Sequence, residues 1–259
     1  MALTAVEKKL VGAVGFDEGV CKLLKQESGG SLTRLIRFTE QFDPVEAEGL
    51  AVKVPRAEAA RIVARLQPQL LPRGYRLFWT GHYNRKGNGD GDAVALLKTT
   101  DETEIIRLRR SNGGNYGVST GDILRALQSW RSRCEFEIVG ADGDWVAIQF
   151  LTLPERVCEF AEEIYELCAD TVEQGVGLRN ESDYPKEFAA ARRLCPELTE
   201  KMERKLQSKQ AEIEAMKKNV PPQVRAMLDS SGFTTPTDMG IRLLAYQLKQ
   251  SKQLYLWWD

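Results

Sequence analysis

Two pairs of short apolar segments constrain the fold most, because a loop rich in glycine, asparagine or aspartate joins the members of each pair. The first pair is Tyr75–Thr80 and Ala93–Lys98, and the second is Glu135–Val139 and Trp145–Leu151. Aromatic and β-branched residues favour strands, and such loops favour hairpins. The chain is therefore expected to contain antiparallel strands.

Segments with helical periodicity lie between and after these hairpins. Arg56–Leu70 carries an apolar stripe, a helix is expected from Thr120 to about Arg133, and Pro154–Ala169 is amphipathic. The closing residues Leu254–Asp259 predict one more strand. This order favours an α+β fold, in which an antiparallel or mixed sheet is covered by helices.

The rest of the chain predicts two additions to this domain. Residues 1–50 hold two weak helical segments, a Gly-Gly turn and a strand candidate, and we expect them to form an N-terminal appendage to an α+β domain over residues 51–259. A polar helix is expected over Lys201–Lys218, because this segment is mostly charged with sparse apolar positions. Such a helix would face solvent or a partner.

The overall charge argues against a dedicated nucleic-acid-binding protein. The chain has 36 basic and 37 acidic residues and a net charge of -1, whereas proteins that coat DNA or RNA carry a large positive excess. One local basic stretch remains. Its arginines are Arg107, Arg109, Arg110, Arg125, Arg131 and Arg133.

The cysteine pattern and the N-terminus favour the cytoplasm. The five cysteines are an odd number and include no C-x-x-C pair, so we expect buried free thiols in a reducing compartment. They are Cys21, Cys134, Cys158, Cys168 and Cys195. The first residues lack the order of a signal peptide, and no apolar run approaches the roughly 20 residues that span a bilayer.

No complete catalytic set is visible. His82 is the only histidine, and its position between a strand and a loop predicts an exposed side chain. A zinc site is not expected with one histidine and no paired cysteines. Gly87–Asp92 has carboxylates at alternate positions, but Thr99 stands where a calcium loop needs its bidentate glutamate, so a hairpin loop is the better interpretation. We expect no metal and no cofactor.

The turn at Asn112–Tyr116 is the main candidate site. Its glycines and asparagines favour a backbone nest for an anion, and arginines flank it. Alternatively, these arginines are solvated or paired with acids. At the C-terminus Trp257 and Trp258 are adjacent, so in a strand they point to opposite faces, and either the core or a partner covers each. The candidate ligand- or partner-binding residues are Arg107, Arg109, Asn112, Asn115, Tyr116, Asp122 and Trp258.

Glutamates on the helix Pro154–Ala169 leave two interpretations open. Glu159, Glu162, Glu163 and Glu166 share one face, which is either solvated or an acidic surface for a basic partner.

Three groups of residues resemble one family pattern. They are Asn112–Tyr116 with Thr120–Ile123; Trp130 with Ile138–Ala141 and Asp144–Val146; and Leu153-Pro154 with Phe160–Tyr165, Cys168–Asp170, Glu173–Gly175 and the closing Leu256-Trp257-Trp258-Asp259. With these residues the chain resembles, over roughly Val54–Asp259, a bacterial family of domains of unknown function that end in an LWWD-type tail. Ala169 departs from it, because the family pattern has proline there. Relative to the compact family pattern, the resemblance also implies a helical insertion at about residues 180–229.

The resemblance implies no chemistry. It implies an immunity-type role, because such domains occur in the company of bacterial toxin and immunity genes. The expected function is therefore that of a non-catalytic binding protein that neutralises a toxin. The toxin is expected to be encoded by a nearby gene. The alternative is a small-molecule or phosphate-binding protein, or an enzyme, that uses the Asn112–Tyr116 turn. That alternative requires a concave pocket at the turn.

Overall fold

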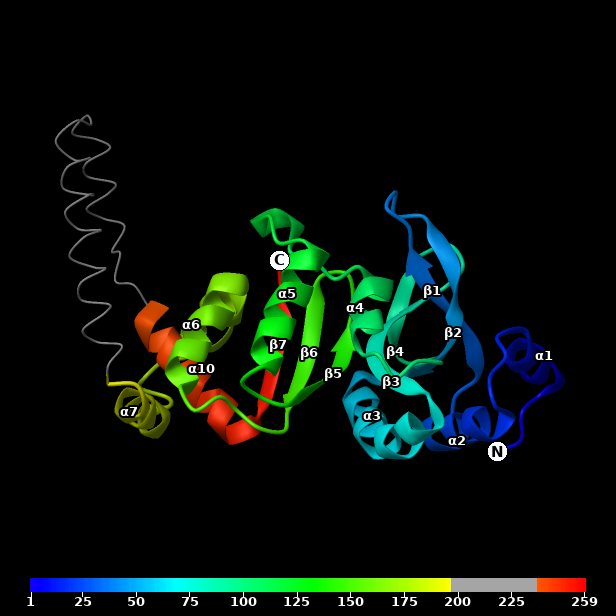
Figure 1. The fold of residues 1–259 in the computed structure, drawn as a ribbon, viewed down its shortest axis with the longest axis horizontal. Helices are drawn as coiled ribbons and strands as arrows, with labels where there is room; N and C mark the ends of the chain where they lie inside the picture. Colours follow the sequence, from blue (N-terminus) through cyan, green and yellow to red (C-terminus); the bar gives the residue numbers. More distant parts are fainter. Residues whose placement is uncertain (197–236) are drawn as a thin grey trace. The chain divides into compact units, whose positions relative to one another are not determined.

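The structure is a computed structural model that describes residues 1–196 and 237–259. The chain folds into two compact units, coloured along the sequence in Figure 1. Unit 1 comprises Met1–Thr152 and Gln253–Asp259, and unit 2 comprises Leu153–Lys252. The expected helix over Lys201–Lys218 lies outside the described residues.

A seven-stranded mixed sheet forms the centre of unit 1. Its strands, in spatial order, are β1 (Leu32–Phe38), β2 (Pro44–Val54), β4 (Gly89–Leu97), β3 (Arg76–Tyr83), β5 (Phe136–Ala141), β6 (Trp145–Phe150) and β7 (Gln253–Trp257). All neighbours are antiparallel except β3 and β5, which meet in parallel at Trp79 and Gly140. The predicted α+β class is confirmed.

Both predicted hairpins are present, and the first is longer than its apolar pattern indicated. The ladder of β3 and β4 continues to the pair Tyr83–Gly89, so the loop between them is shorter than the expected Gly81–Asp92. The reason is that polar residues can lie in the solvent-facing end of an antiparallel ladder. The C-terminal segment is β7, which pairs with β6 and lies at the edge of the sheet (Figure 1).

The helices of unit 1 begin at recognisable caps. They are α1 (Ala5–Ala13), α2 (Glu18–Ser28), α3 (Arg56–Leu70), α4 (Thr103–Arg109) and α5 (Thr120–Arg131). Thr4 and Glu7 form a capping box at α1, and Ser119 and Asp122 form one at α5, each satisfying free backbone N–H groups. The partly alternating pattern of Glu104–Arg110 fits either a strand or a short helix, and in the structure this segment belongs to the helix α4.

The first 50 residues differ from the expected appendage, because they supply β1 and most of β2 to the sheet. Leu50 is fully buried where β2 lies between β1 and β4. Leu24 of α2 and Leu66 of α3 belong to the same apolar cluster as Leu50. The sequence predicts a short strand over Gly49–Val54, and this is confirmed as the buried second half of β2. The polar first half conceals where β2 begins.

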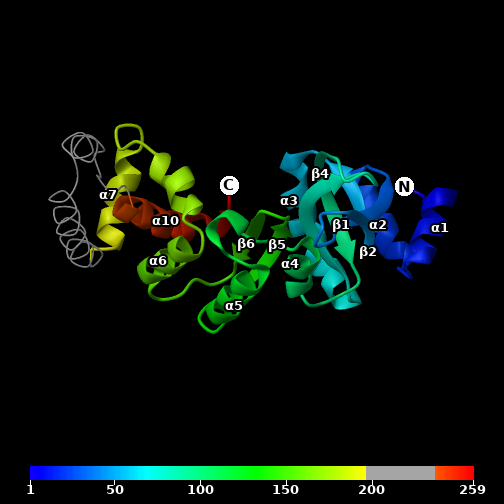
Figure 2. The same ribbon diagram turned by 90° about the horizontal axis from the view of Figure 1, so that it is seen from above.

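Unit 2 is helical. It contains α6 (Val157–Leu167), the short turns η3 (Thr171–Gly175) and η4 (Val176–Leu178), α7 (Pro185–Leu194) and α10 (Thr237–Ser251). Figure 2 shows α10 beside α6 and α7, and it contacts both. None of the described helices is long and apolar enough to cross a membrane.

A disulfide between Cys158 and Cys195 corrects the expectation that all the cysteines are free. It joins the start of α6 to the residue after α7, across a sequence separation of 37. Nothing in the sequence spacing indicates this pairing, because the fold brings the two positions together. The other three cysteines are free and buried.

Candidate functional site

Unit 1 contains a hollow of about 510 Å³, which we call the Trp258 pocket. Five separate parts of the chain line it: residues 38–42 after β1, Tyr83 of β3, residues 109–115 after α4, the β5–β6 turn at 142–144, and Trp258 after β7. The Asn112–Tyr116 turn therefore lies beside a concave surface of a size that small ligands and anchoring side chains occupy.

A buried ion pair forms the base of the Trp258 pocket. Arg109 has a side chain that is 1% exposed and lies 3.1 Å from Asp142. Its guanidinium also donates to the carbonyl oxygens of Ile36 at 2.7 Å and Gly81 at 3.2 Å. A buried charge is tolerated only with such compensation. Arg109 thus joins β1, β3 and the β5–β6 turn, and its charge is not free for a ligand.

Asp142 has several further partners. Its Oδ2 accepts hydrogen bonds from the backbone N–H of Gly81 at 2.9 Å and from the Tyr83 hydroxyl at 2.8 Å. Burial raises the pKa of Tyr83, and the negative charge of Asp142 raises it further. Tyr83 therefore stays protonated, and its hydroxyl donates a hydrogen bond to Asp142.

Backbone N–H groups of the glycine-rich turn already donate hydrogen bonds within the protein. The N–H of Gly114 donates to Asn112 Oδ1 at 3.0 Å, that of Gly113 to Val118 at 2.8 Å, and that of Asn112 to Gly143 at 2.9 Å. The Asn112 side chain thus occupies the position that an anion would take in a nest. This geometry counts against a phosphate at the turn.

Trp258 packs directly on the turn. It is 5% exposed, and its backbone N–H donates to the carbonyl oxygen of Asp144 at 3.0 Å. A Cβ placed on Gly113 would lie 2.4 Å from Trp258 Cδ1, so only glycine fits there. The turn and the C-terminal tail, far apart in sequence, therefore form one wall of the pocket.

The carboxylate of Asp144 stands out among the charges that line the pocket. Burial raises the pKa of Asp144 above its usual value, and the nearby Asp142 and Asp259 raise it further. Within residues 1–196 and 237–259, no ion pair involves Asp144. It is thus an exposed acid beside other acids.

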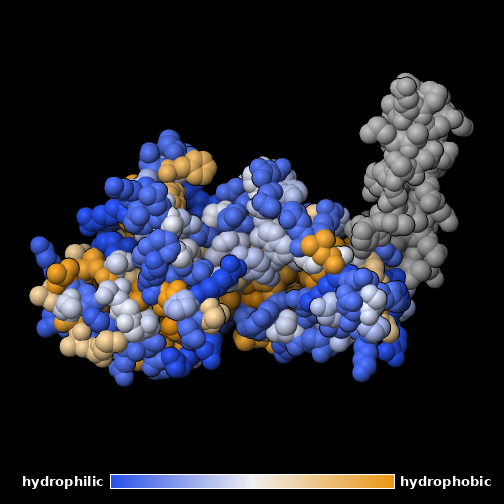
Figure 3. All heavy atoms as spheres, turned by 180° about the vertical axis from the view of Figure 1, so that it is seen from behind, coloured by the Kyte–Doolittle hydropathy of each residue, from blue (hydrophilic) through white to orange (hydrophobic). Residues whose placement is uncertain are grey.

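The outer rim of the pocket carries an apolar side chain, Phe42, which is 81% exposed. Its backbone has φ 61, a left-handed conformation that a bulky residue rarely adopts. Figure 3 shows apolar atoms at the tip of the β1–β2 hairpin, above more hydrophilic surroundings. Phe38, at the inner end of the same loop, packs edge-on against Tyr83 with ring centroids 5.0 Å apart.

The structure brings together four of the seven candidate residues. Arg109, Asn112, Asn115 and Trp258 line the Trp258 pocket. The other three candidates do not line it.

Those three have roles elsewhere on the surface. Arg107 pairs with Asp101 and Glu104. Asp122 caps α5, and Tyr116 lies in the short turn η2 (Gly114–Tyr116) and is 47% exposed.

The pocket residues that sequence reasoning missed include Phe42, Tyr83, Asp142 and Asp144. The last two belong to a segment that was interpreted only as a hairpin turn. The available signal was the large apolar Phe42 in an otherwise polar loop, since such residues often mark a contact surface.

His82 differs from the expected exposed loop residue. It lies in β3, its side chain is 12% exposed, and its Nδ1 is 2.5 Å from Asp90 Oδ1. Asp90 also pairs with Lys53 at 3.0 Å. The carboxylates of Gly87–Asp92 thus have protein partners, and among the described residues no group of three or more His, Cys, Asp or Glu side chains is placed to hold a metal ion.

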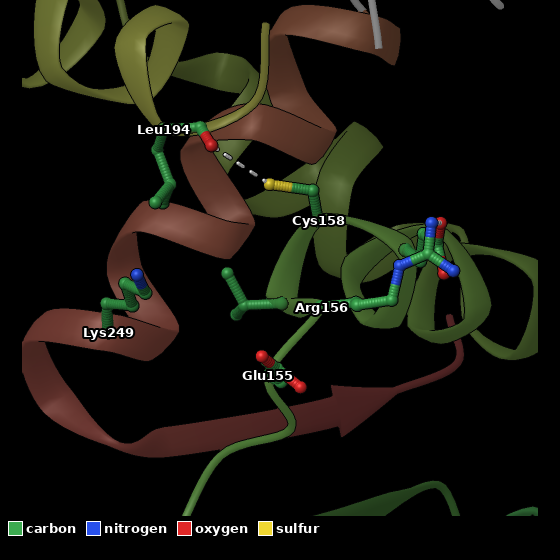
Figure 4. Close-up of a pocket in the computed structure, with 7 residues that line it drawn as sticks. Glu155, Arg156, Cys158, Leu194 and Lys249 are labelled. Carbon is green, nitrogen blue, oxygen red and sulfur yellow. Dashed lines mark hydrogen bonds and ion pairs between the residues drawn. The ribbon is translucent and has the colours of Figure 1, made fainter. Parts of the chain in front are cut away.

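Unit 2 has a smaller hollow of about 270 Å³ (Figure 4). Glu155, Arg156, Cys158, Leu194 and Lys249 are among the residues around it, and Figure 4 shows that Lys249 comes from α10. Arg156 pairs with Glu159 at 2.5 Å, and Cys158 is held in the disulfide. Few polar groups of this hollow are therefore placed to contact a ligand together.

Comparison with sequence families decides the relationship of the chain. A family described as a domain of unknown function, DUF4253, matches residues 93–259, which is more than half of the chain. The chain belongs to the DUF4253 family. Comparisons with curated proteins and with solved structures gave no match.

The DUF4253 match covers only part of the pocket. The Asn112 turn, Asp142, Asp144 and Trp258 lie inside the matched region, and Phe42 and Tyr83 lie before it. The Trp258 pocket is therefore built jointly by the DUF4253 region and the preceding residues 1–92.

Proposed function

We propose that this DUF4253 protein is a non-catalytic binding protein and that the Trp258 pocket with its rim is the recognition site. The observation that carries this proposal is Phe42, which is 81% exposed and has φ 61 at the rim of the pocket. Strained backbone of this kind costs about 1–3 kcal/mol and clusters at ligand clamps and binding sites. An exposed phenyl ring has no stabilising role in unit 1, so a role in contact with a partner accounts for it.

The chemistry of the pocket favours binding over catalysis. Arg109 and Asp142 are engaged with each other, and the raised pKa of Tyr83 keeps its hydroxyl protonated. His82, the only histidine, is bound to Asp90 outside the pocket lining. The pocket residues thus lack an activated nucleophile with an adjacent base.

In its specific form, the proposal makes the partner a toxin encoded nearby, which this protein neutralises by direct binding. That form rests on the family resemblance. Its expected compartment is the bacterial cytoplasm, although a disulfide such as Cys158–Cys195 is rare there. The exposed Phe42 beside a concave pocket supports the general part, since apolar anchors next to a pocket are typical of protein–protein recognition.

The test is a binding measurement with the purified product of the neighbouring gene. Calorimetry should give a stable complex, and Phe42→Asn should weaken it at least about tenfold, because burial of a phenyl ring contributes roughly 1.5–3 kcal/mol. Asn tolerates the left-handed backbone, so the fold is retained.

Val6→Asn is the matched control, because Val6 in α1 is 78% exposed and lies away from the pocket. It should leave the dissociation constant unchanged. An unchanged constant for Phe42→Asn would remove the rim from the proposal. Failure to form any complex with the neighbouring gene product would remove its toxin-neutralising form.

A small-molecule ligand is the second candidate, and the volume of about 510 Å³ favours it. A phosphate is the less suitable class, because Arg109 pairs with Asp142 and the turn N–H groups are engaged. Thermal unfolding with inorganic phosphate and nucleotides tests it: a ligand at 100 times its Kd stabilises by about 2.7 kcal/mol. No rise in Tm with any of them would reject the phosphate form.

A further inference from the structure

We infer that the Trp258 pocket recognises a positively charged side chain, lysine or arginine, presented by a partner protein. The inference rests on the proposed binding function and specifies the chemistry of the ligand. It is carried by the charges and the aromatic side chains that line one cavity.

The charged groups of the pocket leave one acid without a cation. Arg109 pairs with Asp142 at 3.1 Å, and Arg110 pairs with Glu40 at 3.4 Å. Asp144 is the remaining charged residue of the lining, and Asp259 adds negative charge near it. The pocket therefore carries net negative charge.

The environment of Asp144 favours a cationic ligand. Its exposed carboxylate lies near the carboxylates of Asp142 and Asp259, so an incoming positive charge relieves an unfavourable interaction. Trp258 and Phe38 supply aromatic surface in the same pocket, whereas the guanidinium of Arg109 already lies over the Tyr83 ring, 5.2 Å from its centroid. Ammonium and guanidinium groups bind to aromatic faces, most strongly where water is excluded.

Features around the pocket favour a protein as the source of that cation. A free amine would fill the pocket and leave Phe42 uncovered, since Phe42 lies on the rim and is 81% exposed. A partner surface around its basic side chain would cover Phe42. The engaged N–H groups at Gly113 and Gly114 exclude the opposite charge from the turn.

Nuclear magnetic resonance of the full chain with short capped peptides tests the inference. The probes are acetyl-Gly-X-Gly-amide peptides in which X is lysine, arginine, glutamine or glutamate. The lysine and arginine peptides should shift the Trp258 indole and Asn115 side-chain signals, and the other two should not. This comparison uses the unaltered protein and so does not depend on the folding of a variant.

Asp144→Asn should weaken binding of the lysine peptide about tenfold, because it removes the uncompensated charge. The backbone carbonyl of residue 144 that accepts from Trp258 is retained. The matched control is Glu48→Gln, which removes one exposed carboxylate from β2 outside the pocket and should change nothing.

Two results would overturn the inference: equal shifts with the glutamate peptide, or an unchanged affinity in Asp144→Asn. Tighter binding of free spermidine than of the lysine peptide would overturn the protein source. If these tests fail while Phe42→Asn still weakens the partner complex, the proposed binding function stands. Only the inferred recognition of a positively charged side chain is then wrong.

Discussion

At the scale of single residues, Phe42 combines a cost to stability with a proposed benefit to binding. Its φ of 61 disfavours a bulky side chain, and the ring is 81% exposed. Phe42→Asn should therefore stabilise the protein by about 1 kcal/mol, whereas Phe42→Val should destabilise it, since β-branched residues fit this conformation worst. Chemical denaturation measures both. Equal stabilities would show that the backbone is not strained.

Glu7 is a second residue with a measurable role, because it ties the N-terminal helices to the sheet. Its carboxylate lies 2.5 Å from Lys25 Nζ and also accepts from the N–H groups of Thr4 and Leu32. Burial alone would raise the pKa of Glu7, but these hydrogen bonds outweigh it and lower the pKa to about 2. The stabilisation is therefore complete above the usual pKa of 4.5 and is lost as the pH falls towards 2.

Glu7→Gln tests this role. It should destabilise the protein by about 3 kcal/mol, because Lys25 would remain buried without its counter-charge. It should also remove much of the loss of stability between pH 4.5 and 2 that the unaltered protein shows. The control is Glu18→Gln, which breaks an exposed pair with Lys22 in α2 and should have little effect. Parallel pH profiles of Glu7→Gln and the unaltered protein would contradict the assignment.

At the scale of elements, the contact between the Asn112 turn and the tail after β7 holds one wall of the pocket. Gly113→Ala should destabilise the protein by about 1–3 kcal/mol, because the new methyl group would overlap Trp258. Gly12→Ala is the matched control. It meets no atom within 4 Å in α1 and should stabilise by about 0.5–1 kcal/mol. Unfolding curves decide, and a neutral Gly113→Ala would show that the tail can move away.

The elements also show where sequence reasoning ends. Local pattern predicted both hairpins, because alternation and turn residues act over a few positions. It did not decide α4, whose buried Ile105, Ile106 and Arg109 contact more than one element. The residues of the Asn112–Tyr116 turn were sufficient to predict it. The position of Asp142 beside this turn depends on pairing between distant strands, such as the parallel contact of Trp79 with Gly140, which local sequence does not reveal.

At the scale of the whole molecule, residues 1–50 fold as part of unit 1. Leu24 of α2 and Leu66 of α3 are both buried in one apolar cluster. Leu24→Ala and Leu66→Ala should each cost about 2–5 kcal/mol, the usual range for such a cavity. Both variants should lower the midpoint of the same cooperative unfolding transition. Near-ultraviolet circular dichroism and hydrogen exchange in β3 measure it.

An exposed position gives the control for this last comparison: Val6→Ala should leave the transition in place, since Val6 is 78% exposed. If residues 1–50 were a separate appendage, Leu24→Ala would leave exchange in β3 unchanged while Leu66→Ala accelerated it. Accelerated exchange in both variants would instead mean that the Phe42 loop is held by the same core as the DUF4253 strands. The Trp258 pocket would then form and unfold together with unit 1.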